Sequence, residues 1–225
     1  MTETDDVVLK RLLDTRYSCR SFLPKPVPQE TIARILEIAA RTASNNNAQP
    51  WQVIVTSGAG TEKFREAFHQ AAQTEPWEPD YPTAAHFDIY KDRSRACGLA
   101  LYKSVEIGRE DKDKAREQLL RNFQLFGAPH AAIITSDIRQ GPFGALDCGA
   151  YINTFVLAAR SLGVDSIAQG AFAQQAKFLR RYFGLGDDRV IVNGISFGYE
   201  DKEHPVNGFR TGRAPIEEIV TFVNE

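Results

Sequence analysis

The chain has 225 residues but no long hydrophobic run and only three cysteines. Its longest uninterrupted apolar stretch, from Phe155 to Ala159, is far shorter than the roughly 20 residues that a membrane helix needs. The acidic start, from Thr2 to Asp6, does not resemble a signal peptide. The cysteines are far apart and form no C-x-x-C pair, which argues against a disulfide framework or a zinc cage. These features predict a cytoplasmic protein with no membrane partner.

The sequence also lacks an excess of charge of either sign. Lys and Arg together number 27, and Asp and Glu 29, so the net charge is −2 and there is no overall basic field to attract nucleic acid. Hydrophobic residues make up 43% and charged residues 25%, as in an ordinary globular chain and unlike a disordered one. We therefore predict no nucleic-acid partner and expect any anionic ligand to be held by a local cluster.

Motifs of several enzyme classes are missing. The chain contains no H-E-x-x-H and no P-loop, and its four histidines lack ligand spacing, so no metal site is predicted. No G-x-G-x-x-G follows a predicted strand. Gly58-Ala59-Gly60 and Gly184-Leu185-Gly186 are better explained as a turn and a helix stop. A Rossmann dinucleotide domain is therefore not predicted.

Hydrophobic spacing predicts more helices than strands. Helices are expected at residues 8–13, 28–43, 61–72, 94–102, 111–126, 146–162, 174–183 and 215–223, and strands at 51–56, 131–136, 164–167 and 190–197. Because the strands are few and scattered, we predict an α+β fold with helices packed on a small sheet. No Pro/Gly/Ser-rich hinge separates two apolar halves, so residues 1–225 are expected to form a single domain.

One region has no clean period. Residues 76–92 contain three prolines, one Trp and two Tyr, followed by the predicted helix at 94–102. Long loops of this kind often cover a functional site. We therefore predict an irregular excursion around residues 76–108 that covers the site.

Basic side chains cluster at element boundaries near both ends of the chain. Arg16 and Arg20 lie in one non-periodic stretch, and Arg210 and Arg213 lie in another. Guanidinium groups of this kind suit a phosphate dianion, but taken singly such arginines are more often solvated surface residues.

Two further polar segments have both a structural and a functional reading. Residues 45–47 are three asparagines followed closely by Gln49, which form either a simple turn or a set of amides for the edge of a planar heterocycle. Gln169-Gly170 follows a predicted strand, where glycine gives either a strand-end bulge or a backbone N–H that approaches a ligand closely.

In their order and separation, these segments resemble the nitroreductase family of FMN-dependent oxidoreductases. The chain is most similar to the nitrobenzoate-reductase-like branch. It departs from the family at Ala43, where proline is common, and at Gln169, where many members have Glu-Gly, so the group that bonds flavin N5 is left open. The matching blocks cover nearly the whole chain and are Arg16 to Phe22, Pro26-Val27, Ala43 to Trp51, Arg121 to Phe123, residues 147–159, Ala168 to Gly170, Pro205 to Asn207 and Arg210 to Pro215.

The resemblance implies a central mixed sheet flanked by helices, in an intertwined homodimer with two FMN sites built from both chains. Arg16, Ser18 and Arg20 would contact the phosphate, the ribityl chain and the pyrimidine edge. Arg213 would complete the phosphate clamp, with Tyr17 and Arg210 in the same cofactor site. The remaining site residues would be Ser44, Asn45 and Asn47 from the partner subunit, Gln169 and Gly170 near N5, and Asn122 at the polar rim of the ring.

The resemblance also implies a reaction. Hydride would pass from NADPH or NADH to flavin N5 and then to an electron-poor acceptor, a nitroaromatic or a quinone, in a ping-pong sequence. No side chain is expected to act as a nucleophile, and Cys19 is expected to be a packed thiol. Alternatives are other flavin chemistry on the same scaffold, such as reductive dehalogenation or dehydrogenation, or a non-enzymatic flavin-binding protein. Expected apolar walls over the flavin are Trp77, Tyr81, Phe123 and Phe126.

Overall fold

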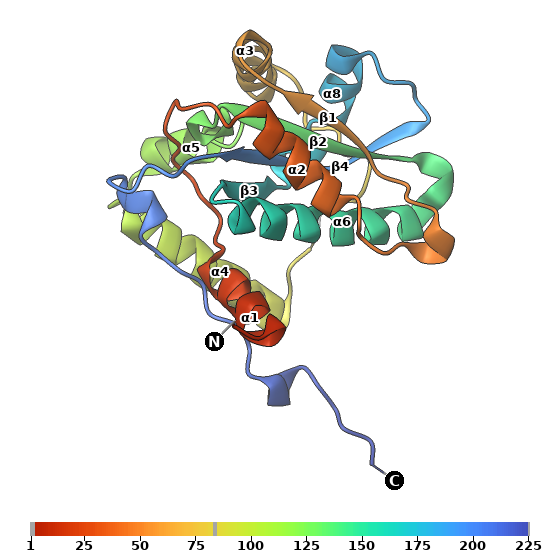
Figure 1. Cartoon of the computed structure of the whole chain (residues 1–225). Helices are drawn as coiled ribbons and strands as arrows, with labels where there is room; N and C mark the ends of the chain where they lie inside the picture. Colours follow the sequence, from red (N-terminus) through yellow and green to blue (C-terminus); the bar gives the residue numbers. More distant parts are fainter. Residues whose placement is uncertain (1–2, 83–84, 225) are drawn as a thin grey trace.

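The computed structural model describes residues 3–82 and 85–224; two positions of the predicted excursion, 83 and 84, and the terminal residues 1, 2 and 225 lie outside the described residues. At its centre is a four-stranded sheet in the order β1-β2-β4-β3 (Figure 1). All three strand pairs are antiparallel, and the expected parallel component is limited to an isolated bridge between Ser18 and Ser166. The strands are β1 (Gln52–Thr56), β2 (His130–Asp137), β3 (Asp165–Gln169) and β4 (Arg189–Gly198).

Helices cover both faces of the sheet. Alternate residues of β2 point to opposite sides, so Ile133 packs into one hydrophobic cluster and Ile134 into the other. On one face lie α2 (Gln29–Ala39) and α6 (Gly141–Ser161), and on the other lie α3 (Ala59–Thr74), α7 (Ala171–Gln174) and α8 (Ala176–Phe183). Figure 1 shows α6 below the sheet and α3 and α8 above it. The predicted α+β architecture is therefore confirmed.

The longest helix, α6, lies against β2 and β3 and has nine buried residues. It extends the helix predicted at residues 146–162 toward the N-terminus, beginning at Gly141 with Pro142 in its first turn. Its apolar composition reflects this position, since one side packs on the sheet and another contacts α1 and α2. The helix therefore connects the core to α1 (Asp5–Thr15).

A close contact positions the short helix α7 on the sheet. A Cβ built at Gly194 of β4 would lie 2.2 Å from Cγ of Phe172, so only glycine allows this ring to lie directly on the strand. Phe172 is fully buried. Because α7 follows directly after Gly170, this packing fixes the chain where β3 ends.

Three predicted helices differ from the structure. The helix expected at 111–126 is shorter, as α5 (Lys112–Leu120), and turns follow it in which Leu125 and Phe126 have positive φ values of 57° and 52°. The helix expected at 174–183 is divided into α7 and α8, and the one at 94–102 is longer, as α4 (Asp88–Ser104). These differences arise from local backbone geometry that hydrophobic spacing does not report.

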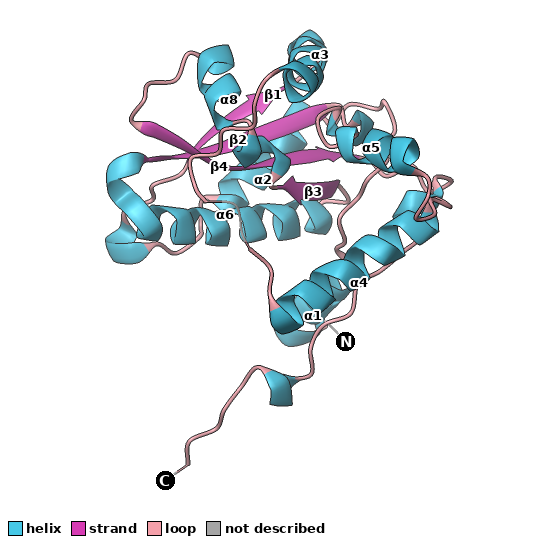
Figure 2. Ribbon diagram, turned by 180° about the vertical axis from the view of Figure 1, so that it is seen from behind, coloured by secondary structure: helices cyan, strands magenta, loops and turns pink. Residues whose placement is uncertain are grey.

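The predicted terminal helix at 215–223 is wrong. The structure contains only one 3-10 turn, Ile216–Glu218, in a segment that projects away from the sheet (Figures 1 and 2). A helix this short is marginal in water unless an apolar face packs on a neighbour. Here Phe222 is 73% exposed, so the stabilising contact is absent.

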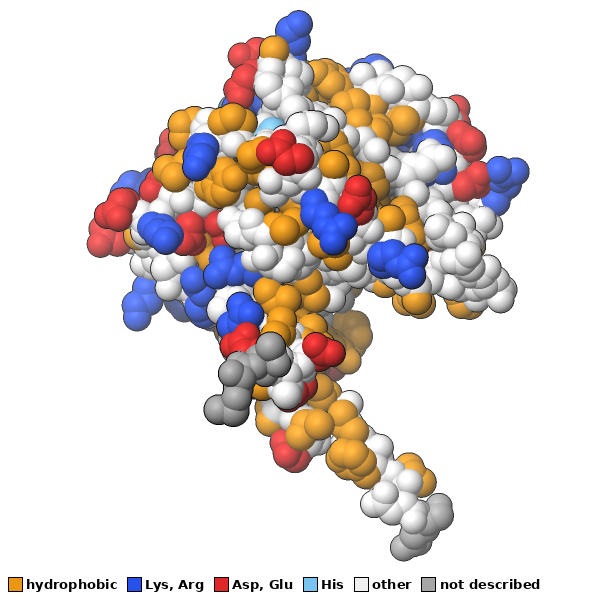
Figure 3. All heavy atoms as spheres, in the orientation of Figure 1, with side chains coloured by type: hydrophobic (Ala, Val, Ile, Leu, Met, Phe, Trp, Pro, Cys, Tyr) orange, Lys and Arg blue, Asp and Glu red, His pale blue; other side chains and the backbone are white. Residues whose placement is uncertain are grey.

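Apolar side chains are exposed along this segment and on the two helices nearest to it. Figure 3 shows them along the projecting C-terminal segment. Several large apolar side chains exposed on neighbouring elements are typical of an interaction site. The exposed apolar side chains are Val7, Leu9 and Leu13 of α1, Ile89, Tyr90 and Leu99 of α4, and Ile216, Ile219, Val220, Phe222 and Val223 of the C-terminal segment.

In the described part of the chain, Cys19, Cys97 and Cys148 are all free thiols. Burial raises the pKa of Cys19 to about 12, so it is a protonated thiol at neutral pH, as expected for a packed cysteine.

Within residues 3–82 and 85–224, none of the helices has both the length and the apolar character that a membrane crossing requires.

Candidate functional site

Two segments from opposite ends of the chain meet at one edge of the fold. The backbone N–H of Leu23 donates to the Tyr199 carbonyl at 2.8 Å, and that of Asp201 donates to the Ser21 carbonyl at 3.0 Å. Asn207, which is 6% exposed, is buried between the two segments. These bonds bring residues 16–23 and 199–213 together, although about 180 positions separate Ser21 from Asp201.

Asn207 fixes this junction with its whole side chain. Its Oδ1 accepts a hydrogen bond from the backbone N–H of Arg20 at 2.8 Å, and its Nδ2 donates to the carbonyls of Ser21 and Asp201, each at 2.9 Å. Both N–H donors of the amide and its carbonyl oxygen are therefore engaged in this junction. The residues predicted for the site do not include Asn207. Its place at the end of the Pro205-Val206-Asn207 block was the available signal.

A cavity of about 760 Å³ opens beside this junction, and we call it the arginine cavity. It is bounded by α1, by the exposed side of α6, by Cys97 of α4 and by the segment after Asn207. Six of the twelve predicted site residues line it: Arg16, Tyr17, Ser18, Arg20, Arg210 and Arg213. The structure therefore brings together the basic residues that the sequence places near opposite ends.

The cations in this cavity are not neutralised by the protein. Over the described residues, none of Arg16, Arg20, Arg210 and Arg213 forms an ion pair, and Asp14 at the edge of the cavity pairs with Lys10 instead. Burial lowers the pKa of Arg16, and the nearby charge of Arg213 lowers it further. An anion between these guanidinium groups would relieve both penalties.

Aromatic rings hold two of the arginines in place. The Arg210 guanidinium carbon lies 3.7 Å from the centre of the Tyr17 ring, and that of Arg20 lies 5.3 Å from the centre of the Phe209 ring. The Tyr17 hydroxyl donates to the Glu200 carboxylate, and burial raises its pKa, so the phenol remains protonated. Arg210 also donates to the Asn207 carbonyl at 2.7 Å. The cations are therefore preorganised.

The Gln169 side chain is occupied inside the protein. Its Nε2 donates to the Asn122 carbonyl at 2.9 Å, and its Oε1 accepts from the Ser196 hydroxyl. Gln169 is 3% exposed. In the part of the chain that the structure describes, no acceptor is recorded for the backbone N–H of Gly170. The group left to reach a ligand at the end of β3 is therefore this N–H rather than the Gln169 amide.

The asparagine turn lies elsewhere. Ser44, Asn45 and Asn47 do not line the arginine cavity. The backbone N–H of Asn45 instead donates to the Asp147 carboxylate near the start of α6, at 3.1 and 3.2 Å. Asn46 and Asn47 have φ values of 48° and 58°, in the left-handed region that asparagine tolerates. A single chain does not bring these residues to the arginines.

Two of the expected apolar walls are wrong. Phe123 and Phe126 are buried in the core, where Phe123 packs against Phe68 with ring centres 5.1 Å apart. They cannot contact a ligand without repacking that core. Trp77, by contrast, is 40% exposed.

Residues 194–198, Gly-Ile-Ser-Phe-Gly, have the G-x-S-x-G spacing of a nucleophile elbow. The structure excludes that role. These residues lie within strand β4 rather than at a strand-to-helix turn, and Ser196 is fully buried with its hydroxyl donating to Gln169.

Comparisons with known proteins agree with this geometry. Residues 13–199 match the model of the nitroreductase family. The chain is 33% identical to a 4-nitrobenzoate reductase of Nocardioides sp. (strain LMS-CY), over 92% of this chain and 87% of the relative. It is 33% identical to nitroreductase NfnB of Mycolicibacterium smegmatis, over 95% and 92%. The solved FMN-dependent nitroreductase NfnB from Mycobacterium smegmatis, in complex with NADPH, superposes with a TM-score of 0.93 at 32% identity, covering 97% of this chain and 99% of that one.

Replacement of Asn207 tests the junction. Asn207→Ala removes three hydrogen bonds and leaves the partly buried backbone N–H of Arg20 without its acceptor, so the free energy of unfolding should fall by about 2–4 kcal/mol on chemical denaturation. Asn153→Ala is the matched control. Asn153 lines the same cavity but is exposed, and its replacement should change stability by less than about 0.5 kcal/mol. Equal stability of the two variants would contradict the assigned role.

Proposed function

This chain belongs to the nitroreductase family, and we propose that it is an FMN-dependent NAD(P)H oxidoreductase that reduces nitroaromatic compounds. The observation that carries the proposal is the arginine cavity, into which both ends of the chain bring guanidinium groups without protein counter-charges. Relatives at about one third identity over most of the chain are named for the reduction of nitroaromatic compounds. Quinones, predicted from the sequence, are further candidate acceptors.

The residues present fit FMN. Its phosphate is a dianion, and Arg16 and Arg213 supply unpaired cations whose mutual repulsion a dianion would relieve. Bound FMN would supply the hydride chemistry, taking hydride from NAD(P)H and passing it to the acceptor. The protein's part is to hold the cofactor and to tune the charge around it.

Arg20 is suited to the tuning role. Its backbone is held by Asn207, and its Nη1 donates to the Ser18 carbonyl at 3.0 Å, so the cation has a fixed direction. A guanidinium at the pyrimidine edge would stabilise the negative charge that the ring gains on reduction. At the end of β3, the Gly170 N–H would face the opposite edge, near N5. Asn122, tied to Gln169, would contact the polar rim.

We also propose that residues 1–225 form one FMN-binding domain. In support, the two hydrophobic clusters share strands β2 and β4. The segment 76–108 includes α4, whose Cys97 lines the arginine cavity, so it would cover the site. The need for NAD(P)H fits the cytoplasmic location predicted from the sequence.

The proposed reaction can be followed in the absorption spectrum. The purified protein should be yellow, and anaerobic addition of NADPH or NADH should bleach the flavin absorption bands. Subsequent addition of 4-nitrobenzoate should restore them, because the acceptor takes the electrons back. A spectrum unchanged by either nicotinamide would contradict the reductase function and favour a non-enzymatic flavin-binding protein.

The exposed apolar surfaces of α1, α4 and the C-terminal segment support a homodimer. A stable interface buries about 800 Å² on each subunit, and large apolar side chains at its centre supply most of the affinity. Leu9, Tyr90 and Phe222 are each more than half exposed in a single chain. In the proposed dimer the partner covers them, and its Ser44, Asn45 and Asn47 complete each FMN site.

A mixed dimer tests the shared site. Arg213→Ala and Asn45→Ala homodimers should each bind FMN poorly. A heterodimer of the two variants, isolated with two different affinity tags, has one site with both changes and one intact site. It should recover roughly half of the wild-type FMN content and activity. No recovery would show that Arg213 and Asn45 act within one chain, which would contradict the two-chain site.

A further inference from the structure

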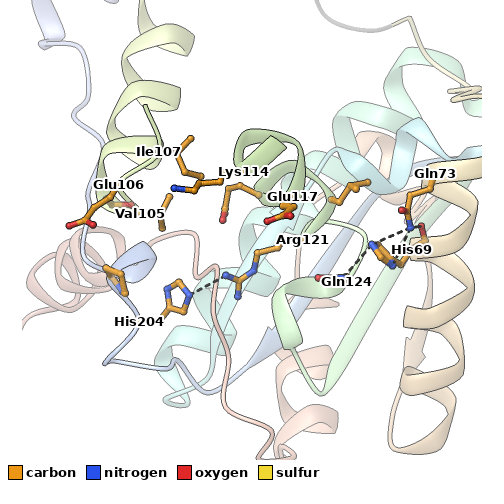
Figure 4. A pocket seen from close by; sticks show the side chains of 14 residues that line it. His69, Gln73, Val105, Glu106, Ile107, Lys114, Glu117, Arg121, Gln124 and His204 are labelled. Carbon is orange, nitrogen blue, oxygen red and sulfur yellow. Dashed lines mark hydrogen bonds between the residues drawn. The ribbon is translucent and has the colours of Figure 1, made fainter. Parts of the chain in front are cut away.

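A second cavity, of about 770 Å³, shares no lining residue with the arginine cavity. We call it the α5 cavity. It lies between α3, α5, the turn after α4 and the 3-10 turn Pro205–Asn207 (Figure 4). Its lining residues include His69 and Gln73 of α3, Lys114, Gln118 and Arg121 of the α5 region, and His204 beside Pro205.

The face of α5 that lines this cavity is rich in hydrogen-bond donors. Lys114, Gln118 and Arg121 are spaced i, i+4 and i+7, which places them on one side of a helix. Gln118 is 7% exposed, and within the described residues its Nε2 has no hydrogen-bond partner. Arg121 forms no ion pair there, and burial lowers its pKa. The buried amide donor therefore lacks an acceptor, and the partly buried cation lacks a counter-charge.

His204 adds a further donor to this cavity. Its Nε2 lies 3.1 Å from Nη1 of Arg121 (Figure 4). Its Nδ1 lies 3.2 Å from the backbone nitrogen of Val206. Both neighbours can only donate, yet a neutral imidazole carries one N–H of its own. One ring nitrogen therefore points its proton at another donor.

His130, which is 3% exposed, shows the contrast. Nε2 of His130 accepts from the backbone N–H of Val27 at 2.9 Å, while its Nδ1 faces the Ser57 hydroxyl at 3.0 Å and the Thr56 carbonyl at 3.3 Å. Each of its nitrogens has a suitable partner. His204 and Arg121 are thus left with a surplus of donors that the protein itself does not use.

We propose that the α5 cavity binds an organic carboxylate with an apolar body, whose carboxylate accepts hydrogen bonds from Arg121, His204 and Gln118. One anionic acceptor group would satisfy all three donors, and charge-assisted bonds to it are stronger than neutral ones. The apolar body would lie against the hydrophobic part of the lining, which consists of Val105, Ile107, Leu120 and Pro205.

The charge around the cavity favours a carboxylate over a phosphate. Glu106 and Glu117 also line it and are exposed, as is Lys114. The two exposed carboxylates offset much of the positive charge of Lys114 and Arg121. A monoanion tolerates this balance better than a dianion does, unlike in the arginine cavity, where such carboxylates are few.

Benzoate is the direct probe, because it has no reducible group and its binding needs no nicotinamide. Isothermal titration of the FMN-loaded protein should show one saturable benzoate site per chain. Arg121→Met should weaken binding at least ~10-fold and Gln118→Leu by about 3-fold or more. Arg116→Met is the matched control. Arg116 is an exposed arginine on the same helix that does not line the cavity, so its replacement should leave the affinity unchanged.

The opposite results would overturn the proposal. It fails if benzoate does not saturate, or if Arg121→Met and Gln118→Leu bind it as the wild type does, as they would if benzoate occupied only the flavin face. FMN content and thermal unfolding show whether each variant is folded. If Arg121→Met does not fold, the benzoate affinity of Gln118→Leu decides the outcome. Since titration is done without NADPH, the result is independent of whether the protein reduces nitroaromatic compounds.

Discussion

The functional half of this structure depends on the buried amide of Asn207. Its three hydrogen bonds join the backbone of Arg20 and Ser21 to the backbone around Asp201. The basic residues before and after this point lie in irregular segments, which isolated bridges such as Ser18 to Ser166 connect to the rest of the fold. Asn207 joins the two segments to each other, and the ring of Tyr17 holds Arg210. Without this junction the chain would keep its sheet and its helical layers but would not bring its terminal arginines to one cavity.

This junction explains why a nearly neutral chain can hold an anion. The net charge of −2 reflects an even mixture of charged residues over the whole surface. Locally, the fold brings four arginines together without protein counter-charges, while the α5 cavity mixes cations with carboxylates. The two cavities are therefore suited to different anions. Net charge describes neither, because ligand recognition depends on the few charges within one Debye length of the site.

Periodicity and motif order predicted the helical layers, the four strands and six residues of the arginine cavity. The sequence could not predict features that depend on tertiary packing. Phe123 reads as an aromatic wall, yet its ring is needed in the core against Phe68. The segment 215–223 has helical spacing but no surface to pack on within one chain. Gln169 reads as a ligand contact, but its amide is used by Asn122 and Ser196. In each case a partner distant in sequence decides the outcome.

The central claim is that the arginines from both chain ends bind one phosphate. It is tested most directly by comparing FMN with riboflavin, which differ only in that phosphate, in fluorescence-quenching titrations of the flavin-free protein. Several charge-assisted hydrogen bonds to the phosphate should make FMN bind at least ~100-fold more tightly than riboflavin. Equal dissociation constants for the two flavins would contradict the account.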